Sequence, residues 1–119
     1  MIIVGGFNVY PREIDDTLLA HPAVVESATI GVPDERRGER PVTFVSAAPD
    51  TPLDLQELER HCAERLTAYK RPSRILILPE LPRTPANKID RITLRKHPVL
   101  ASSEPGNAPE GAGKVTEPG

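Results

Sequence analysis

Prolines divide this chain into short segments, and the run from Leu81 to Ile89 (LPRTPANKI) is the most constrained of them. Each proline fixes φ and removes a backbone donor, and the residues before Pro82 and Pro85 are pushed toward extended geometry. The run therefore predicts a rigid, exposed arm with the ammonium of Lys88 at its tip. Such a compact charge suits a phosphate or a carboxylate, although a surface lysine is more often only solvated.

Short apolar runs and amphipathic segments together predict an α+β fold. Two short runs on either side of Gly5-Gly6 predict a small N-terminal β-hairpin. A three-stranded sheet is expected to follow, with its strands at Val24–Val32, Val42–Ala47 and Arg74–Leu78. Alternation is imperfect in the first of these strands. In the second it places Val42 and Phe44 on one face and Val45 on the other.

Two main helices are expected to pack on the sheet, and a short C-terminal helix is expected after the lysine arm. Pro11 fits the first position of the first helix, where a missing N–H costs nothing. The apolar positions of that helix are Ile14, Leu18 and Leu19, and its outward positions are Arg12, Glu13, Asp15 and Asp16. Asp54 and Glu57 match a capping box at the start of the second helix. Its apolar stripe is Leu55, Leu58, Cys62 and Leu66.

Composition divides the chain into a domain and a tail. Residues 1–100 are numerous enough to bury a modest core and are expected to form one domain. Residues 101–119 hold three prolines, four glycines and three glutamates. So little apolar surface cannot offset chain entropy, which predicts a disordered tail.

Charge and residue usage argue against several classes of function. A net charge of −2 does not fit a nucleic-acid-binding face. The single cysteine, Cys62, rules out an internal disulfide, and the three histidines lack metal-ligand spacing, so no metal site is predicted. No apolar run is long enough to span a membrane, and no signal peptide is visible, so the expected compartment is the cytoplasm.

Two separated motifs carry a family resemblance. The opening from Met1 to Ile14 (MIIVGGFNVYPREI) and the arm from Leu81 to Ile89 resemble the C-terminal subdomain of the adenylate-forming superfamily. That superfamily contains acyl-CoA synthetases, peptide-synthetase adenylation domains and luciferases. The resemblance extends to about Pro98, and the intervening segments that fit it are Val24–Asp34, Gly38–Glu39, Pro41–Val45 and Leu66–Pro72.

The resemblance implies a catalytic role for Lys88. In the family, this lysine contacts the acid's carboxylate and the α-phosphate of ATP during adenylation. A positioned cation there would offset the charge of two anions as they are joined. The family commonly has glycine before this lysine, whereas this chain has Asn87. Asparagine tolerates the left-handed conformation better than most residues, so the arm is expected to keep its geometry.

The resemblance also implies that Gly5 and Gly6 line the pantetheine tunnel during thioester formation. On the residues alone, such a pair is more often no more than a hairpin turn. A further set of cations, either solvated or holding the 3′-phosphate of coenzyme A, comprises Arg36, Arg37, Arg40, Lys70, Arg71 and Arg74. The sequence does not choose among them.

The resemblance places the remaining substrate-binding elements in a large N-terminal domain, and the family's hinge residue normally precedes the position of Met1. We therefore expect an excised domain, a split-enzyme subunit or a free-standing protein. The implied function is that of the mobile lid subdomain of an ATP-dependent acid–CoA ligase, acting with an N-terminal adenylating domain in cis or in trans. The chain alone would be inactive.

The complete ligase would use ATP and either coenzyme A or carrier-protein phosphopantetheine, with Mg²⁺ bound alongside ATP and not by this chain. The acid substrate is not specified here. Two other classes stay open, namely a non-catalytic protein-interaction module and an anion- or nucleotide-binding regulatory domain with the same fold.

Overall fold

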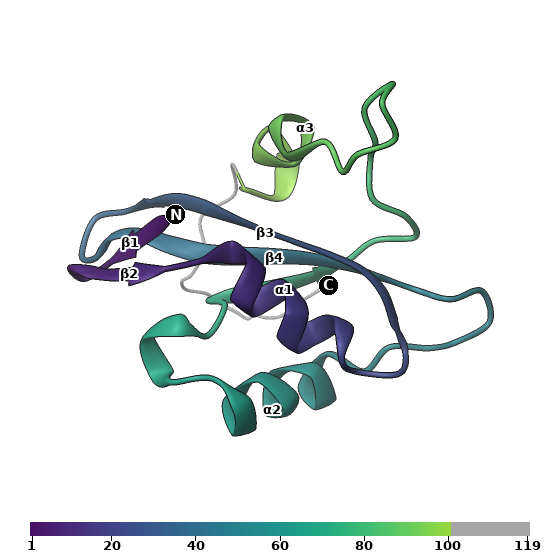
Figure 1. Ribbon diagram of the computed structural model, residues 1–119, viewed down its shortest axis with the longest axis horizontal. Helices are drawn as coiled ribbons and strands as arrows, with labels where there is room; N and C mark the ends of the chain where they lie inside the picture. The colour runs from purple at the N-terminus through teal and green to yellow at the C-terminus, as the bar shows by residue number, and fades with distance from the viewer. Residues whose placement is uncertain (101–119) are drawn as a thin grey trace.

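The computed structural model describes residues 1–100, and Figure 1 shows helices on both faces of one sheet. The predicted hairpin is confirmed: β1 (Ile2–Val4) and β2 (Phe7–Val9) pair antiparallel. Its turn needs glycine, because Gly5 and Gly6 have φ of +57° and +87°. The predicted tail at 101–119 lies outside the described residues.

The three predicted sheet strands are also confirmed. The long strands β3 (Val24–Asp34) and β4 (Gly38–Ala47) pair antiparallel, and β5 (Arg74–Ile77) runs parallel to β4. The hairpin joins the same sheet, because Val4 of β1 pairs with Gly38 of β4. Within residues 1–100, β4 is therefore the central strand, with β3 on one edge and β1 and β5 along the other.

The imperfect alternation of β3 has a structural cause. The register of the β3–β4 pair shifts between Val24 and Glu26, which is a β-bulge. Val24 consequently packs on one side of the sheet, while Ala28 and Ile30 pack on the other. The strand also continues through Pro33 to Asp34, two residues beyond the predicted end at Val32. Proline is tolerated there because β3 lies at an edge of the described sheet.

Helices α1 (Pro11–Leu19) and α2 (Leu55–Arg65) cover one face. Asp54 caps α2 by accepting a hydrogen bond from the Gln56 N–H at 3.0 Å. The core on this face contains Ile2, Val4, Val9, Ile14, Leu18, Val24, Val45, Leu58, Cys62, Leu66 and Ile75. Leu19 and Leu55, predicted to be inward, are instead more than two-fifths exposed, because each lies at an end of its helix, outside the packed stripe.

The opposite face carries α3 (Arg91–Arg95) and the arm between β5 and α3 (Figure 1). Its core contains Ala28, Ile30, Val32, Val42, Phe44, Leu81 and Leu94. Leu81 begins the arm and Leu94 lies just beyond it, so buried apolar side chains anchor the arm at both ends. Two short 3₁₀ helices, η1 (Ala68–Lys70) and η2 (Pro98–Leu100), complete the described elements.

Candidate functional site

The arm that carries Lys88 ends in a loop closed by its own backbone. Arg83 and Ile89 form an antiparallel bridge at the base of the loop. The Thr84 N–H donates to the Lys88 carbonyl at 2.7 Å, and the Asn87 N–H donates to the Thr84 carbonyl at 2.8 Å. The Lys88 N–H donates to Thr84 Oγ1 at 3.3 Å. The expected rigid arm is therefore a compact, hydrogen-bonded loop.

Asn87 occupies the position at which this loop reverses direction. Its φ of +65° lies in the left-handed region, where asparagine is the favoured residue after glycine. Asn87 thus adopts the left-handed conformation that the sequence led us to expect at this position.

Lys88 lies on the exposed part of the loop. The residue is exposed, and its ammonium forms no ion pair or hydrogen bond with any of residues 1–100. Lys70 contrasts with it, because its Nζ lies 3.0 Å from Glu13 Oε2. The Lys88 ammonium is therefore available to an external anion.

A buried carboxylate secures the far end of the arm. The side chain of Arg91, directly after the arm, donates to the Thr29 carbonyl at 2.9 Å and lies 3.4 Å from Asp15 Oδ2. Asp15 Oδ1 accepts hydrogen bonds from Ser27 Oγ at 3.0 Å and Thr29 Oγ1 at 2.7 Å. Arg91 thus links α3 to α1 across the edge of β3.

The position of Asp15 corrects the sequence prediction, which placed this residue outward. It is only 6% exposed. Burial raises its pKa above the usual value and outweighs the opposing effects of Thr29, Ser27 and Arg91. A signal for this burial was present in the sequence. Ser27 and Thr29 are polar and lie two positions apart on β3, so they share a face of the sheet that would otherwise be apolar and need a polar partner there.

The Gly5–Gly6 turn forms the second candidate region. The Gly5 N–H donates to the Arg37 carbonyl at 2.8 Å, which fixes the turn against the loop between β3 and β4. Among residues 1–100, no non-neighbouring atom lies within 4 Å of the point where a Cβ would lie on either glycine. Beside the turn, the rings of Phe7 and Tyr69 stack with centroids 4.4 Å apart. Another molecule could therefore approach this backbone closely.

Of the six candidate phosphate-binding cations, three lie near the glycine pair. Arg36 and Arg37 lie in the turn after β3, next to the glycine pair, and Lys70 reaches the same region through the Phe7–Tyr69 stack. Arg71 is occupied elsewhere, because its guanidinium donates to the carbonyls of Leu66 and Ala63 at 2.9 and 3.1 Å. The Arg71 guanidinium is therefore already engaged by two backbone carbonyls, which weakens it as a candidate.

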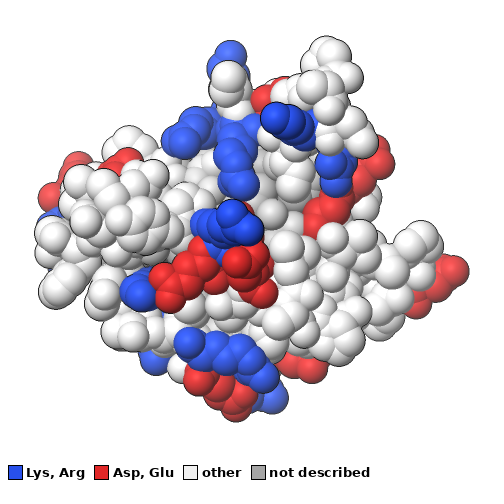
Figure 2. Space-filling view, viewed as in Figure 1, with Lys and Arg blue, Asp and Glu red and all other residues white. Residues whose placement is uncertain are grey.

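The two candidate regions lie at opposite ends of the molecule. The hairpin is at one end of the sheet, and the loop between β5 and α3 rises from the face that carries α3, near the other end (Figure 1). Figure 2 shows basic side chains gathered over α3, whereas acidic and basic side chains mix over α1 and α2. Lys88 therefore lies in a segment next to a locally positive surface, away from the glycine turn.

A comparison with protein-family models now adds to the geometry. Residues 13–88 match the model described as the AMP-binding enzyme C-terminal domain. The chain belongs to this family. The match ends at Lys88, and the fold agrees with that of solved members. A fatty acyl CoA synthetase from Mycobacterium tuberculosis superposes with a TM-score of 0.75 and 38% identity, over 84% of this chain and 20% of that one.

Curated relatives give the same result. A sulfoacetate–CoA ligase from Cupriavidus necator is 42% identical over 97 residues, covering 82% of this chain and 19% of the ligase. A long-chain-fatty-acid–CoA ligase from Yersinia pestis is 46% identical over 99 residues, which cover 83% of this chain and 17% of that ligase. This AMP-binding enzyme C-terminal domain thus spans about a fifth of the length of the ligases that it matches.

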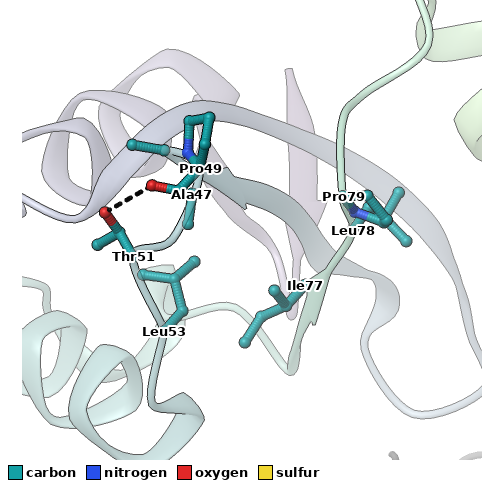
Figure 3. Close-up of a pocket in the computed structure, with 8 residues that line it drawn as sticks. Ala47, Pro49, Thr51, Leu53, Ile77, Leu78 and Pro79 are labelled. Atoms are coloured by element: carbon teal, nitrogen blue, oxygen red, sulfur yellow. Dashed lines mark hydrogen bonds between the residues drawn. The ribbon is translucent and has the colours of Figure 1, made fainter.

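A hollow on another surface of the domain is lined by side chains that cannot ionise. The hollow, of about 420 Å³, lies beside the ends of β4 and β5 (Figure 3). Its lining is Ala47, Ala48, Pro49, Thr51, Leu53, Ile77, Leu78 and Pro79. None of these side chains is ionisable. Within residues 1–100, no cluster of His, Cys, Asp and Glu could hold a metal ion, and no helix is long and apolar enough to cross a membrane.

Proposed function

We propose that this domain is the mobile lid of a cytoplasmic, ATP-dependent acid–CoA ligase, and that Lys88 is its catalytic residue. The observation that carries the proposal is the Lys88 ammonium, which forms no ion pair with any of residues 1–100 and lies on a closed, exposed loop at the end of the family match. The relatives' names, which are those of CoA ligases, support the same reaction class.

In the first half-reaction, a carboxylate oxygen of the acid attacks the α-phosphorus of ATP. The bond from that phosphorus to the bridging oxygen breaks, and pyrophosphate leaves with the electron pair. Negative charge accumulates on the oxygens around the phosphorus during this exchange. The Lys88 ammonium would draw the two anions together and offset that charge. The nucleotide and acid pockets would be supplied by the larger N-terminal domain, in cis or in trans.

In the second half-reaction, a thiol attacks the acyl carbonyl of the adenylate, and AMP leaves. The proposed role of Gly5 and Gly6 is to let the pantetheine arm pass close to the backbone. The absence of side chains around the glycine Cβ positions supports this role. Coenzyme A is the favoured thiol, because the relatives described above are CoA ligases. The ion that accompanies ATP would be held outside residues 1–100.

The test uses a chimera in which this chain replaces the matching segment of the Cupriavidus ligase. Lys88→Ala should lower the rate of sulfoacetate adenylation by at least about a hundredfold, the usual effect of losing a positioned electrostatic stabiliser. Lys96→Ala, an exposed lysine outside the loop, is the matched control. Thioester formation from supplied acyl-adenylate should change little in Lys88→Ala. Equal loss in both variants would contradict the proposal.

The glycine turn needs a variant that avoids backbone strain. Gly6→Leu would combine a bulky side chain with a φ of +87°, so a loss of activity could reflect misfolding. Gly6→Asn places a short side chain in the same open space and tolerates positive φ better. It should impair the thioester step and spare adenylation, the reverse of Lys88→Ala. Equal impairment of both steps by both variants would show that the residues act through folding.

A further inference from the structure

Arg83 lies between the sheet and the tip of the lysine loop. Its Nη2 is 2.6 Å from Glu26 Oε2 on β3, and its Nη1 donates to the Asn87 carbonyl at 3.0 Å. Asn87 immediately precedes Lys88, so the guanidinium bonds the peptide from which the lysine projects. The rigid fork of arginine can serve both acceptors together, whereas a lysine ammonium is a point charge without that geometry.

Glu26 is itself held firmly through its second oxygen. Glu26 Oε1 accepts hydrogen bonds from Ser46 Oγ at 2.6 Å and from the Leu81 N–H at 3.1 Å. Its side chain is 14% exposed. Burial alone would raise the pKa of Glu26, but the hydrogen bonds from Ser46, Leu81 and Arg83 outweigh burial and hold the pKa below its usual value. The carboxylate is therefore charged at neutral pH.

The loop's own hydrogen bonds fix its shape but not its orientation on the domain. The Thr84–Lys88 and Thr84–Asn87 bonds would move with the loop as a unit. The chain of contacts from Ser46 through Glu26 and Arg83 to the Asn87 carbonyl ties that unit to two strands of the sheet. A charge stabilises a transition state only when it is held where the new charge develops.

We propose that Glu26 and Arg83 are positioning residues that hold Lys88 for acyl-adenylate formation. This inference rests on the catalytic role proposed above for Lys88. Arg83 fixes the peptide before the lysine, and Glu26 fixes Arg83. Neither residue needs to touch the substrate.

The first test measures order in the 119-residue chain itself. Arg83→Lys keeps a positive charge facing Glu26 but removes the fork. The ¹⁵N heteronuclear NOE of the Asn87 and Lys88 amides should fall from strand-like values toward those of flexible loops, while the amides of β3 and β4 keep theirs. An unchanged NOE at Asn87 and Lys88 would overturn the inference.

Arg65→Lys is the matched control. Arg65 Nη1 likewise bridges a carboxylate and a backbone carbonyl, Glu64 Oε1 at 3.3 Å and the His61 oxygen at 3.2 Å, but on α2. It should leave the NOE of the Lys88 loop unchanged. If the NOE of the Lys88 loop fell by a similar amount in Arg65→Lys and Arg83→Lys, the cause would be a general increase in flexibility of the domain, and the inference would be overturned.

The second test measures rates in the chimera described above. Arg83→Lys should lower the adenylation kcat by roughly ten- to a hundredfold, the effect of a small misplacement, with the KM for the acid little changed. Glu26→Gln should act in the same direction but less, because its amide oxygen can still accept from Arg83. The thioester step from supplied adenylate should be spared in both.

The outcomes separate the two proposals. If Lys88→Ala abolishes adenylation while Arg83→Lys leaves it unchanged despite a lowered NOE, the positioning role is wrong and the function of Lys88 stands. If Lys88→Ala itself leaves adenylation intact, the proposed function fails, and the positioning role for that step fails with it.

Discussion

At the scale of single residues, Asn87 decides whether the lysine loop can form. A residue with φ of +65° is strained unless it is glycine or a short polar residue. The sequence predicted that this asparagine would preserve the loop, because the expectation depended only on local backbone preference. Asp15 shows the opposite case. Its buried carboxylate contacts Arg91, 76 positions away, and no local pattern reports such a partner.

The effect of a substitution at Asn87 on the free energy of unfolding should depend on backbone strain and not on side-chain size. Asn87→Gly should change the free energy of unfolding by less than about 1 kcal/mol. Asn87→Val should lower it by about 1–3 kcal/mol, because a β-branched residue is strained at positive φ. Urea denaturation of the chain measures both. An Asn87→Val protein as stable as the Asn87→Gly protein would show that the loop can adopt another conformation without cost.

The contributions of Glu26 and Asp15 to the stability of the domain should change with pH in opposite directions. The pKa of Glu26 is lowered from 4.5, so its contribution to stability is present above pH 4.5 and is lost as pH falls through the folded-state pKa. The pKa of Asp15 is raised from 3.8, so its contribution is present below pH 3.8 and is lost as pH rises through the folded-state pKa.

Urea denaturation between about pH 3 and pH 7 can test this prediction. The stability advantage of the wild type over Glu26→Gln should shrink as pH falls. Relative to Asp15→Asn, the wild type should lose stability as pH rises. If the stability difference between wild type and variant changed with pH in the same direction for Glu26→Gln and Asp15→Asn, the assigned directions of the two pKa shifts would be wrong.

At the scale of the elements, strand faces were predictable where pairing is regular. The alternation in β4 correctly separated Val42 and Phe44 from Val45, because side chains alternate with period two. The same logic was ambiguous in β3, where the bulge after Val24 shifts the alternation by one residue. Bulges depend on the partner strand, so a single strand's sequence does not show them.

The cap of α2 gives a prediction at this scale. Asp54 accepts from the Gln56 N–H, so Asp54→Ala should lower the free energy of unfolding by about 0.5–2 kcal/mol. Asp16→Ala is the control, because within residues 1–100 this exposed carboxylate has a single ion-pair contact, 3.8 Å from Arg12. Chemical denaturation should separate the two variants clearly. Equal losses would show that acidic charge, not capping, explains the effect at Asp54.

At the scale of the whole molecule, the sheet is covered on both faces, and its two candidate regions lie at opposite ends (Figure 1). The α+β class and the positions of the strands along the chain were predictable, because each element is defined by nearby residues, whereas the joining of the hairpin to β4 was not. The contacts that orient the lysine loop were not predictable either. Glu26 and Arg83 are 57 positions apart, and each alone has the appearance of an ordinary surface charge. Their pairing exists only in the folded chain.

The last prediction also concerns the whole molecule. Residues 1–100 fold around their own two cores, so the chain should be stable in isolation. It should nevertheless form no acyl-adenylate, because the hollow in Figure 3 is apolar and Lys88 projects from a loop outside it. Pyrophosphate release with ATP and a panel of acids should match that of Lys88→Ala. Turnover above that variant would mean that this chain holds a substrate pocket of its own. The same preparation, added to a ligase whose matching C-terminal segment has been removed, should restore adenylation if the domain can act in trans.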